Sequence, residues 1–406
     1  MRAWIHASEV LTGEGVRSAD GVRPTEEHLG RIDDGAIVTE SAGKRERIAW
    51  VGPTRKLPKR YVKAKRTNLR GERAVLPGFV DAHTHLVFAG DRSDEFADRC
   101  GGATYQEIAA RGGGITKTVF ATRSASEAEL LRLGRERLKE SIAWGVRTIE
   151  LKSGYGLDWE TERKQLRVAG RLQKEFAGQI EVHSTFLGAH AFPPAADGLR
   201  RDQYLSALLE TMLPGVVKGK FASACDVFVD EGYFTRTEGE RLLREAKRLG
   251  LALHVHADEL GNTGSAELAA SVGALSADHC LQISGAGIGA LARSETVAVL
   301  LPGTAFFLKA GQAPAREMID RGVRVALATD FNPGTCPTLN LPLIMTMAAL
   351  QLGMSRAEIF AAVTYNGARA LGVSDRRGTL EVGMDAAVFV APFKRFDELY
   401  YRAGWR

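Results

Sequence analysis

Residues 77–85 read Pro-Gly-Phe-Val-Asp-Ala-His-Thr-His, a short apolar run that ends on polar side chains. Seven further runs rich in Val, Ile and Leu follow along the chain, and amphipathic stretches lie between most of them. Strands that are buried on both faces, as in parallel sheets, produce such continuous apolar runs. The eight predicted strands are residues 78–84, 145–151, 180–186, 226–229, 252–255, 274–278, 296–301 and 323–328.

Eight alternating strand and helix units predict an α/β protein whose residues 74–371 form a (β/α)₈ barrel of the TIM type, a fold that typically takes about 250 residues. The helical stretches at residues 126–143 and 235–249 begin with Ser126 and Thr235, which are good N-cap residues. A doubly wound open sheet is the alternative fold. It is disfavoured because no Gly-x-Gly-x-x-Gly motif follows the first strand.

The segments on either side of the predicted barrel lack its alternation of strand-like and helical stretches. Residues 1–73 are polar and rich in turns, and residues 372–406 return to short strand-like pieces. Neither segment alone could bury a core, so we expect the two to pair into one small β-sandwich-like domain. Within the barrel, residues 86–123 and 189–222 exceed ordinary loop lengths, and we expect these two segments to border the binding site.

The composition excludes several classes of protein. The 406 residues are 45% hydrophobic and 25% charged, proportions that exclude disordered and fibrous proteins. No apolar run reaches the roughly 18 residues of a membrane span, and no signal-peptide pattern opens the chain. The four cysteines are far apart and form no Cys-x-x-Cys motif, so we expect no disulfide framework, no structural zinc cluster and a cytoplasmic location.

The net charge of +5 comes largely from a basic stretch at residues 55–70. A basic surface can bind nucleic acid, but a small local excess is more often a solvated surface. We therefore expect no nucleic-acid partner and no membrane partner.

Histidines mark the predicted strand ends. In TIM-type barrels the catalytic residues gather at the C-terminal ends of the strands. Seven of the nine histidines lie within or just after the predicted strands: His83, His85, His183, His190, His254, His256 and His279.

His83 and His85 are two positions apart at the end of the first strand, so both side chains point to one face and could hold one ion. His254 and His256 have the same spacing in the fifth strand. His256 lies nearer the C-terminal end of that strand and is the predicted third ligand. His254 lies deeper, where a hydrogen-bonded histidine of the barrel interior is the simpler interpretation.

Asp330 follows the eighth strand and completes a predicted set of three imidazoles and one carboxylate. This set suits Zn²⁺ or iron better than Mg²⁺ or Ca²⁺, and it would let a bound water lose a proton near neutral pH. Glu259 and His279 are the expected acid–base groups. The fourth strand has no lysine that could bridge a second ion. Lys152 follows the second strand, so a second ion stays open, but a single ion is the prediction.

These residues resemble the amidohydrolase superfamily and, within it, the imidazolonepropionase family of histidine degradation. The similar motifs are spread over most of residues 77–335, and a ninth stretch near the C-terminus resembles the small β domain of the superfamily. The motifs are residues 77–85 (PGFVDAHTH), 86–92 (LVFAGDR), 112–115 (GGGI), 151–157 (LKSGYGL), 184–191 (STFLGAHA), 256–259 (HADE), 276–279 (SADH), 329–335 (TDFNPGT) and 378–387 (GTLEVGMDAA).

The resemblance implies one zinc or iron ion held by His83, His85, His256 and Asp330. It implies hydrolysis of the ring amide C–N bond of 4-imidazolone-5-propanoate to N-formimidoyl-L-glutamate. In this reaction a metal-bound hydroxide attacks the ring carbonyl carbon. Arg92 is placed to grip the propanoate carboxylate in a bidentate manner. The substrate contacts that the resemblance implies are Arg92, Tyr155, His190, Glu259, Asn332, Gly334 and Thr335.

Several alternatives stay open at this point. Glu259, His279 and Asp330 are the catalytic candidates, and the sequence does not rank them as bases. A deaminase of a cytosine- or adenosine-like ring would use the same ligands, with less need for Arg92. A non-catalytic scaffold is disfavoured, because such proteins usually lose ligands. Barrels of this kind are commonly dimers, so a homodimer is the expected assembly.

Overall fold

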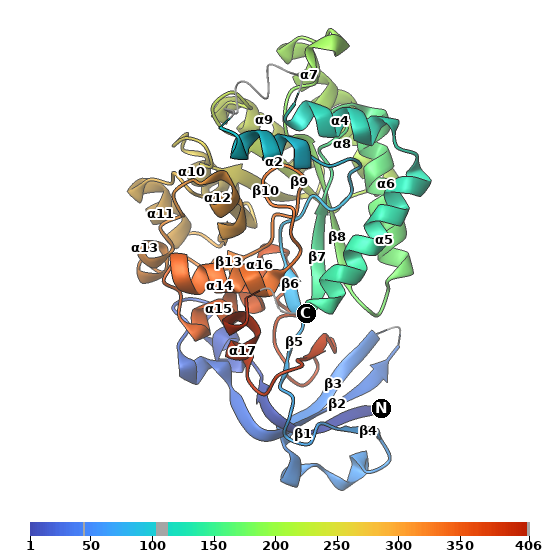
Figure 1. Ribbon diagram of the computed structural model, residues 1–406, viewed down its shortest axis with the longest axis vertical. Helices are drawn as coiled ribbons and strands as arrows, with labels where there is room; N and C mark the ends of the chain where they lie inside the picture. The colour runs from blue at the N-terminus through green and yellow to red at the C-terminus, as the bar shows by residue number, and fades with distance from the viewer. Residues whose placement is uncertain (44, 103–112, 404–406) are drawn as a thin grey trace.

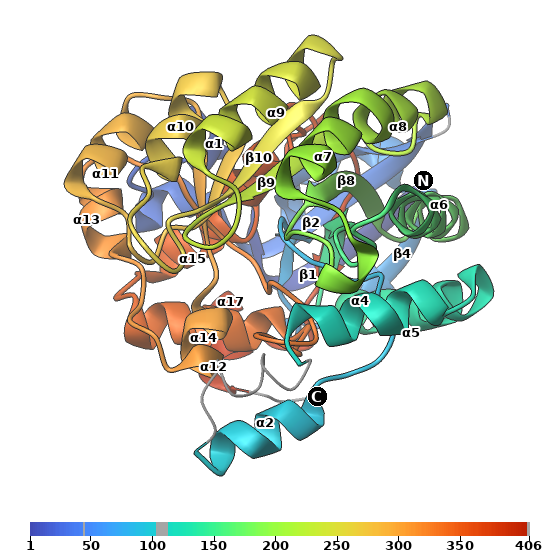
Figure 2. The same ribbon diagram turned by 90° about the horizontal axis from the view of Figure 1, so that it is seen from above.

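The computed structural model describes residues 1–43, 45–102 and 113–403, and its largest sheet has eight strands in chain order from β6 to β13 (Figures 1 and 2). Every neighbouring pair in this sheet is parallel. Each strand overlaps one of the eight predicted runs, so the predicted barrel is confirmed. The strands are β6 (Phe79–Asp81), β7 (Val146–Lys152), β8 (Glu181–Ala189), β9 (Ala224–Val229), β10 (Ala252–Ala257), β11 (Ser276–His279), β12 (Val297–Leu300) and β13 (Val325–Leu327).

The first and last strands meet through the residues that follow them. The backbone N–H of Asp330 donates to the carbonyl of His83 at 3.0 Å, and the N–H of His85 donates to the carbonyl of Phe331 at 2.9 Å. The buried carboxylate of Asp81 accepts from both the N–H and the hydroxyl of Thr329, at 3.0 and 2.7 Å. The barrel therefore joins its two ends at the segment that carries the His-x-His motif.

Helices surround the strands, as Figure 2 shows for α5, α6, α9, α10, α11 and α13. The predicted caps are present: the Ser126 side chain accepts from the N–H of Glu129, and Thr235 forms a reciprocal capping box with Glu238. The helices are α1 (Glu14–Ser18), α2 (Ser93–Cys100), α4 (Ile115–Ser124), α5 (Glu127–Ala143), α6 (Trp159–Glu175), α7 (Arg201–Ala207), α8 (Leu213–Gly219), α9 (Arg236–Arg248), α10 (Ser265–Val272), α11 (Gly285–Ala292), α12 (Pro302–Leu308), α13 (Ala315–Asp320), α14 (Leu341–Gln351), α15 (Arg356–Ala362), α16 (Tyr365–Ala370) and α17 (Phe396–Tyr401).

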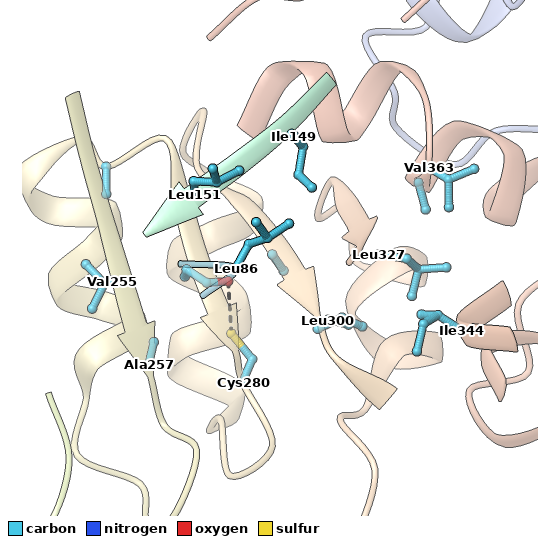
Figure 3. Close-up of a cluster of buried hydrophobic side chains, with 14 of the residues drawn as sticks. Leu86, Ile149, Leu151, Val255, Ala257, Cys280, Leu300, Leu327, Ile344 and Val363 are labelled. Atoms are coloured by element: carbon cyan, nitrogen blue, oxygen red, sulfur yellow. Dashed lines mark hydrogen bonds between the residues drawn. The ribbon is translucent and has the colours of Figure 1, made fainter. Parts of the chain in front are cut away.

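Alternation along the barrel strands separates the core from the barrel interior. In β10, Val255 and Ala257 belong to the large buried apolar cluster, whereas His254 and His256, at the alternate positions, make polar contacts. Figure 3 shows Val255 and Ala257 beside other strand residues of this cluster, such as Leu151 and Leu300. In β10, one face therefore packs into the apolar core, and the other carries polar side chains.

A second, six-stranded sheet lies at the opposite end of the barrel from α2, α4 and α7 (Figure 1). Its order is β14-β5-β1-β2-β3, and β4 also pairs with β1. It therefore joins the two ends of the chain, and the predicted separate sheet domain is confirmed. The strands are β1 (Arg2–Leu11), β2 (Arg31–Ala42), β3 (Arg45–Pro53), β4 (Lys65–Asn68), β5 (Val75–Pro77) and β14 (Val388–Val390).

Segments without strand structure cover both faces of this smaller sheet. Leu380 packs with Ile37 and Ile48, and on the other face Tyr61 packs with Val38. Among the described residues these segments, rather than a second sheet, supply the outer layers that a sandwich-like domain needs. The division of the chain after residues 73 and 371 stays a prediction. The smaller sheet includes β5, which leads directly into β6.

The two long segments of the barrel carry short helices. Residues 86–123 contain α2 and α4, and residues 189–222 contain α7 and α8. The Gly-Gly-Gly-Ile motif at residues 112–115 lies partly outside the described residues. Within the described ranges, no helix is both long and apolar enough to cross a membrane.

The packing of the C-terminal segment on the smaller sheet gives a test. Leu380 is fully buried, so we expect Leu380→Ala to leave a cavity and to lower the free energy of unfolding by about 2–5 kcal/mol. Denaturant unfolding followed by tryptophan fluorescence would measure it, because Trp4 and Trp50 lie in this sheet. Val382→Ala is the control: this side chain is 64% exposed, and we expect a change within about 0.5 kcal/mol. Equal effects of the two changes would contradict the packing described.

Candidate metal centre and active site

The four predicted ligands lie together at the C-terminal ends of the barrel strands. His83 and His85 follow β6, His256 lies in β10 and Asp330 follows β13. His85 Nε2 is 3.3 Å from His83 Nε2 and 3.4 Å from His256 Nε2. Asp330 Oδ1 is 3.4 Å from His83 Nε2 and 3.5 Å from His85 Nε2. None of the four residues is more than 2% exposed.

These spacings fit a single tetrahedral ion. Zinc binds histidine nitrogen at about 2.0–2.1 Å, and ligand atoms at the corners of a tetrahedron of that size are about 3.4 Å apart. The four separations given above lie between 3.3 and 3.5 Å. His83, His85 and Asp330 can therefore hold one ion, and His256 lies at a similar spacing from His85.

Other groups of side chains near this centre could also bind a metal. His279 lies close to His83 and His256, and His190 lies close to His85 and His256. Asp226, His256 and Asp278 form a third group. The ammonium of Lys152 lies within that third group, 2.7 Å from Asp226 Oδ2 and 3.3 Å from Asp278 Oδ2.

Two buried carboxylates support the ligand histidines, and sequence reasoning missed both of them. Asp278 Oδ2 is 2.7 Å from His83 Nδ1, and Asp226 Oδ2 is 2.9 Å from His256 Nδ1. Carboxylates in this position fix the ring orientation of metal-binding histidines and leave Nε2 toward the metal. The sequence signal was a lone Asp inside an apolar strand, in β9 and in β11.

Glu259 and His279 are adjacent in the site, with 3.6 Å between Glu259 Oε2 and His279 Nε2. Burial raises the pKa of Glu259 to about 8, and the charges of Asp330 and Asp230 add to the effect. Burial also lowers the pKa of His279 to about 3. Asp230 accepts hydrogen bonds from the backbone N–H groups of Glu259, Leu260 and Gly261, so its carboxylate fixes the segment that carries Glu259.

Three non-glycine residues of the centre have a left-handed backbone. The φ angles are 47° at Asp258, 71° at His279 and 50° at Asp330. This conformation is costly for ordinary residues, and such positions concentrate at active sites. The turns after β10, β11 and β13 therefore aim side chains into the barrel mouth at some cost in stability.

A cavity of about 300 Å³ is lined by three of the four predicted ligands. Among the predicted site residues, His83 and Gly334 do not line it, because His83 lies deeper. The cavity also has apolar walls that sequence reasoning missed, including Phe228 and Tyr233. The predicted residues that line it are His85, Arg92, Tyr155, His190, His256, Glu259, His279, Asp330, Asn332 and Thr335.

Arg92 enters the cavity from the segment after β6. Its Nε donates to Glu95 Oε2 at 2.8 Å, and Glu95 Oε1 accepts from the N–H of Gly114 at 3.1 Å. A Cβ atom at Gly334 would lie 2.1 Å from Arg92 Nη1. A side chain at position 334 would therefore displace the guanidinium, which lies against the backbone of Gly334.

The turn at residues 332–335 is held by its own side chains. Asn332 Oδ1 accepts from the N–H groups of Gly334 and Thr335, both at 2.8 Å. These two N–H groups are thus already paired, and the side chains of Asn332 and Thr335 are what this turn presents to the cavity.

Tyr155 and His190 form the opposite wall. Glu162 accepts from the backbone N–H groups of Gly154 and Gly156, at 3.0 and 2.8 Å, and so fixes the loop that carries Tyr155. His190 Nδ1 lies 3.0 Å from the carbonyl of Gly154, and its ring stacks on His85 with centroids 4.9 Å apart.

Comparison with known proteins agrees with this architecture. The Amidohydrolase family matches residues 74–395. An imidazolonepropionase of Bdellovibrio bacteriovorus is 44% identical over 98% of this chain and 92% of that protein. The chain belongs to the imidazolonepropionase family of amidohydrolases. Other imidazolonepropionases agree: that of Symbiobacterium thermophilum is 47% identical over 94% of this chain and 89% of its own length.

Solved structures share the amidohydrolase fold at low identity. A 5-methylcytosine deaminase from Klebsiella pneumoniae has a TM-score of 0.71 and 17% identity, over 99% of this chain and 94% of that one. An adenosine deaminase from Xanthomonas campestris with bound zinc has a TM-score of 0.67 and 19% identity, over 96% and 84%. At these identities the likeness concerns the fold.

The convergence of four ligand atoms gives a test of metal binding. We expect His85→Ala to weaken zinc binding by more than about 100-fold, since loss of an outer partner alone typically costs 10–100-fold. Elemental analysis after dialysis against a zinc buffer would measure the bound metal. His183→Ala is the control, because His183 contacts Glu181 at the start of β8, away from the four ligands. Retention of zinc by His85→Ala would contradict this ligand set.

Proposed function

We propose that this chain is a metal-dependent hydrolase that opens the ring amide of 4-imidazolone-5-propanoate to give N-formimidoyl-L-glutamate. The observation that supports it best is one cavity lined by metal-binding histidines, an acid–base pair and an arginine. The 42–48% identity to imidazolonepropionases supports the choice of substrate.

The proposed ligands of the ion are His83, His85, His256 and Asp330. Nitrogen and oxygen donors of this kind accept zinc or iron. Such an ion supplies Lewis acidity: it lowers the pKa of a water and polarises a carbonyl group.

The protein's own residues bind the substrate and move protons. Within the described part of the chain, the side-chain hydrogen bond of Arg92 is made by Nε with Glu95 and leaves both Nη atoms available, so Arg92 is proposed to bind the propanoate carboxylate. Tyr155, His190, Asn332 and Thr335 line the cavity around the ring, and Gly334 leaves room for the guanidinium. Apolar side chains such as Phe228 exclude water and strengthen these polar contacts.

Glu259, His279 and Asp330 are the proposed proton-transfer groups. Glu259 and His279 are adjacent on one side of the ligand group, where they can orient the attacking water and take its proton. Asp330 Oδ2 contacts the hydroxyl of Thr304 at 2.5 Å, while its Oδ1 faces the histidines. Asp330 is therefore placed to pass a proton to the departing ring nitrogen.

The reaction itself is the first test. We expect the purified, metal-loaded protein to consume freshly generated 4-imidazolone-5-propanoate, followed by the loss of its ultraviolet absorbance, without releasing ammonia. Release of ammonia from a cytosine- or adenosine-like ring, with no ring opening of the imidazolone, would favour the deaminase alternative.

The acid–base pair gives a second test. We expect Glu259→Gln and His279→Ala each to lower kcat by about 10²–10⁴-fold, the usual contribution of a positioned acid or base. The two decreases, measured with saturating substrate and equal metal content, rank the two groups. Near-normal rates in both variants would reject this assignment.

Recognition of the carboxylate gives a third test. Loss of charge-assisted hydrogen bonds worth about 1.5–3 kcal/mol would raise the KM of Arg92→Met by roughly 10–150-fold, with a smaller change in kcat. Arg132→Met is the control, since Arg132 is exposed on α5 and pairs with Glu129. An unchanged KM in Arg92→Met would show that another group binds the carboxylate.

Three further features stay predictions. They are the choice between zinc and iron, a cytoplasmic location and a homodimeric assembly. The four cysteines are all free thiols, which agrees with a reducing compartment.

A further inference from the structure

Lys152 has no part in the mechanism above, yet it carries a buried charge beside the metal centre. The residue is only 1% exposed and lies at the C-terminal end of β7. Its Nζ is 2.7 Å from Asp226 Oδ2, 2.9 Å from Glu150 Oε2 and 3.3 Å from Asp278 Oδ2. A buried ammonium is costly unless it is paired, so the three carboxylates are what make this position tolerable.

Two of these carboxylates connect the ammonium to the ligand histidines through a single oxygen each. Asp226 Oδ2 contacts both Lys152 Nζ and His256 Nδ1, at 2.7 and 2.9 Å. Asp278 Oδ2 contacts both Lys152 Nζ and His83 Nδ1, at 3.3 and 2.7 Å. One ammonium therefore fixes the two oxygens that orient the two rings.

We propose that Lys152 is a positioning residue for the metal centre. Its ammonium holds Asp278 Oδ2 in its hydrogen bond with His83 Nδ1 and holds Asp226 Oδ2 2.9 Å from His256 Nδ1, so that both rings present Nε2 to the ion. Lys152 acts through these carboxylates and touches neither the ion nor the substrate. The inference rests on the metal centre of the proposed function.

The direction in which metal affinity changes when Lys152 is replaced distinguishes a positioning role from a purely electrostatic effect of its charge. A cation near a divalent ion repels it, so if Lys152 acted through charge alone, its removal would tighten metal binding. If Lys152 positions the carboxylates, its removal frees two rings to turn and weakens metal binding. Loss of an outer partner of a metal ligand typically costs about 10–100-fold in affinity.

The test is the zinc affinity of Lys152→Met, which keeps most of the side-chain volume and removes the charge. Zinc dissociation constants are measured by competition with a chelator on protein shown to be folded by circular dichroism. We expect the constant to rise by about 10–100-fold relative to the unchanged chain. Lys152→Leu serves the same purpose if Lys152→Met does not fold, because it also removes the ammonium and offers the carboxylates no donor.

Lys164→Met is the matched control. Lys164 Nζ donates to the carbonyls of Thr122, Arg123 and Ala125, at 3.0, 2.9 and 2.8 Å, and has no link to the ligands. We expect this variant to lose stability while its zinc affinity stays within about two-fold.

Two outcomes would overturn the positioning role of Lys152, and a third would contradict the metal centre itself. Zinc binding by a folded Lys152 variant that equals or exceeds that of the unchanged chain overturns the positioning role. An equal loss of affinity in Lys164→Met overturns it too, because general loosening would then explain both. Failure of the unchanged chain to bind zinc at all would instead contradict the metal centre.

Discussion

The hydrogen bonds that join residues 83–85 to residues 330–331 are the constraint on which the site depends. They connect the first and last strands of the barrel, at opposite ends of its sheet order. The same bonds bring His83 and His85 beside Asp330, which is more than 240 positions away in the chain. Barrel closure and assembly of the ligand group are therefore one event.

Because side chains alternate between the two faces of a strand, the same strand can stabilise the core and supply polar groups to the site. Val255 and Ala257 pack outward into the apolar core, while His254 and His256 face inward. The inward residues would be costly as isolated charges. They are tolerated because Lys152 and the carboxylates around it compensate one another over short distances.

Much of this could be predicted from the sequence, because the signals were local. Each barrel strand shows as an apolar run, and His-x-His at the end of a run indicates two side chains on one face. Asp226, Asp278 and their link to Lys152 could not be predicted in the same way. Their partners lie on other strands, 74 positions apart for Lys152 and Asp226 and 195 for His83 and Asp278. The strand β1 was also missed, since its buried and exposed residues do not alternate regularly.

The smaller sheet takes strands from both ends of the chain, with β1 at the start and β14 near the finish. During synthesis on the ribosome, β1, β2 and β3 emerge long before β14 exists to cover the edge of β5. At roughly 5–20 residues per second, that interval is on the order of tens of seconds. The exposed edge of a half-built sheet is then open to pairing with other chains, so the cell's chaperones have a defined period in which this protein needs protection.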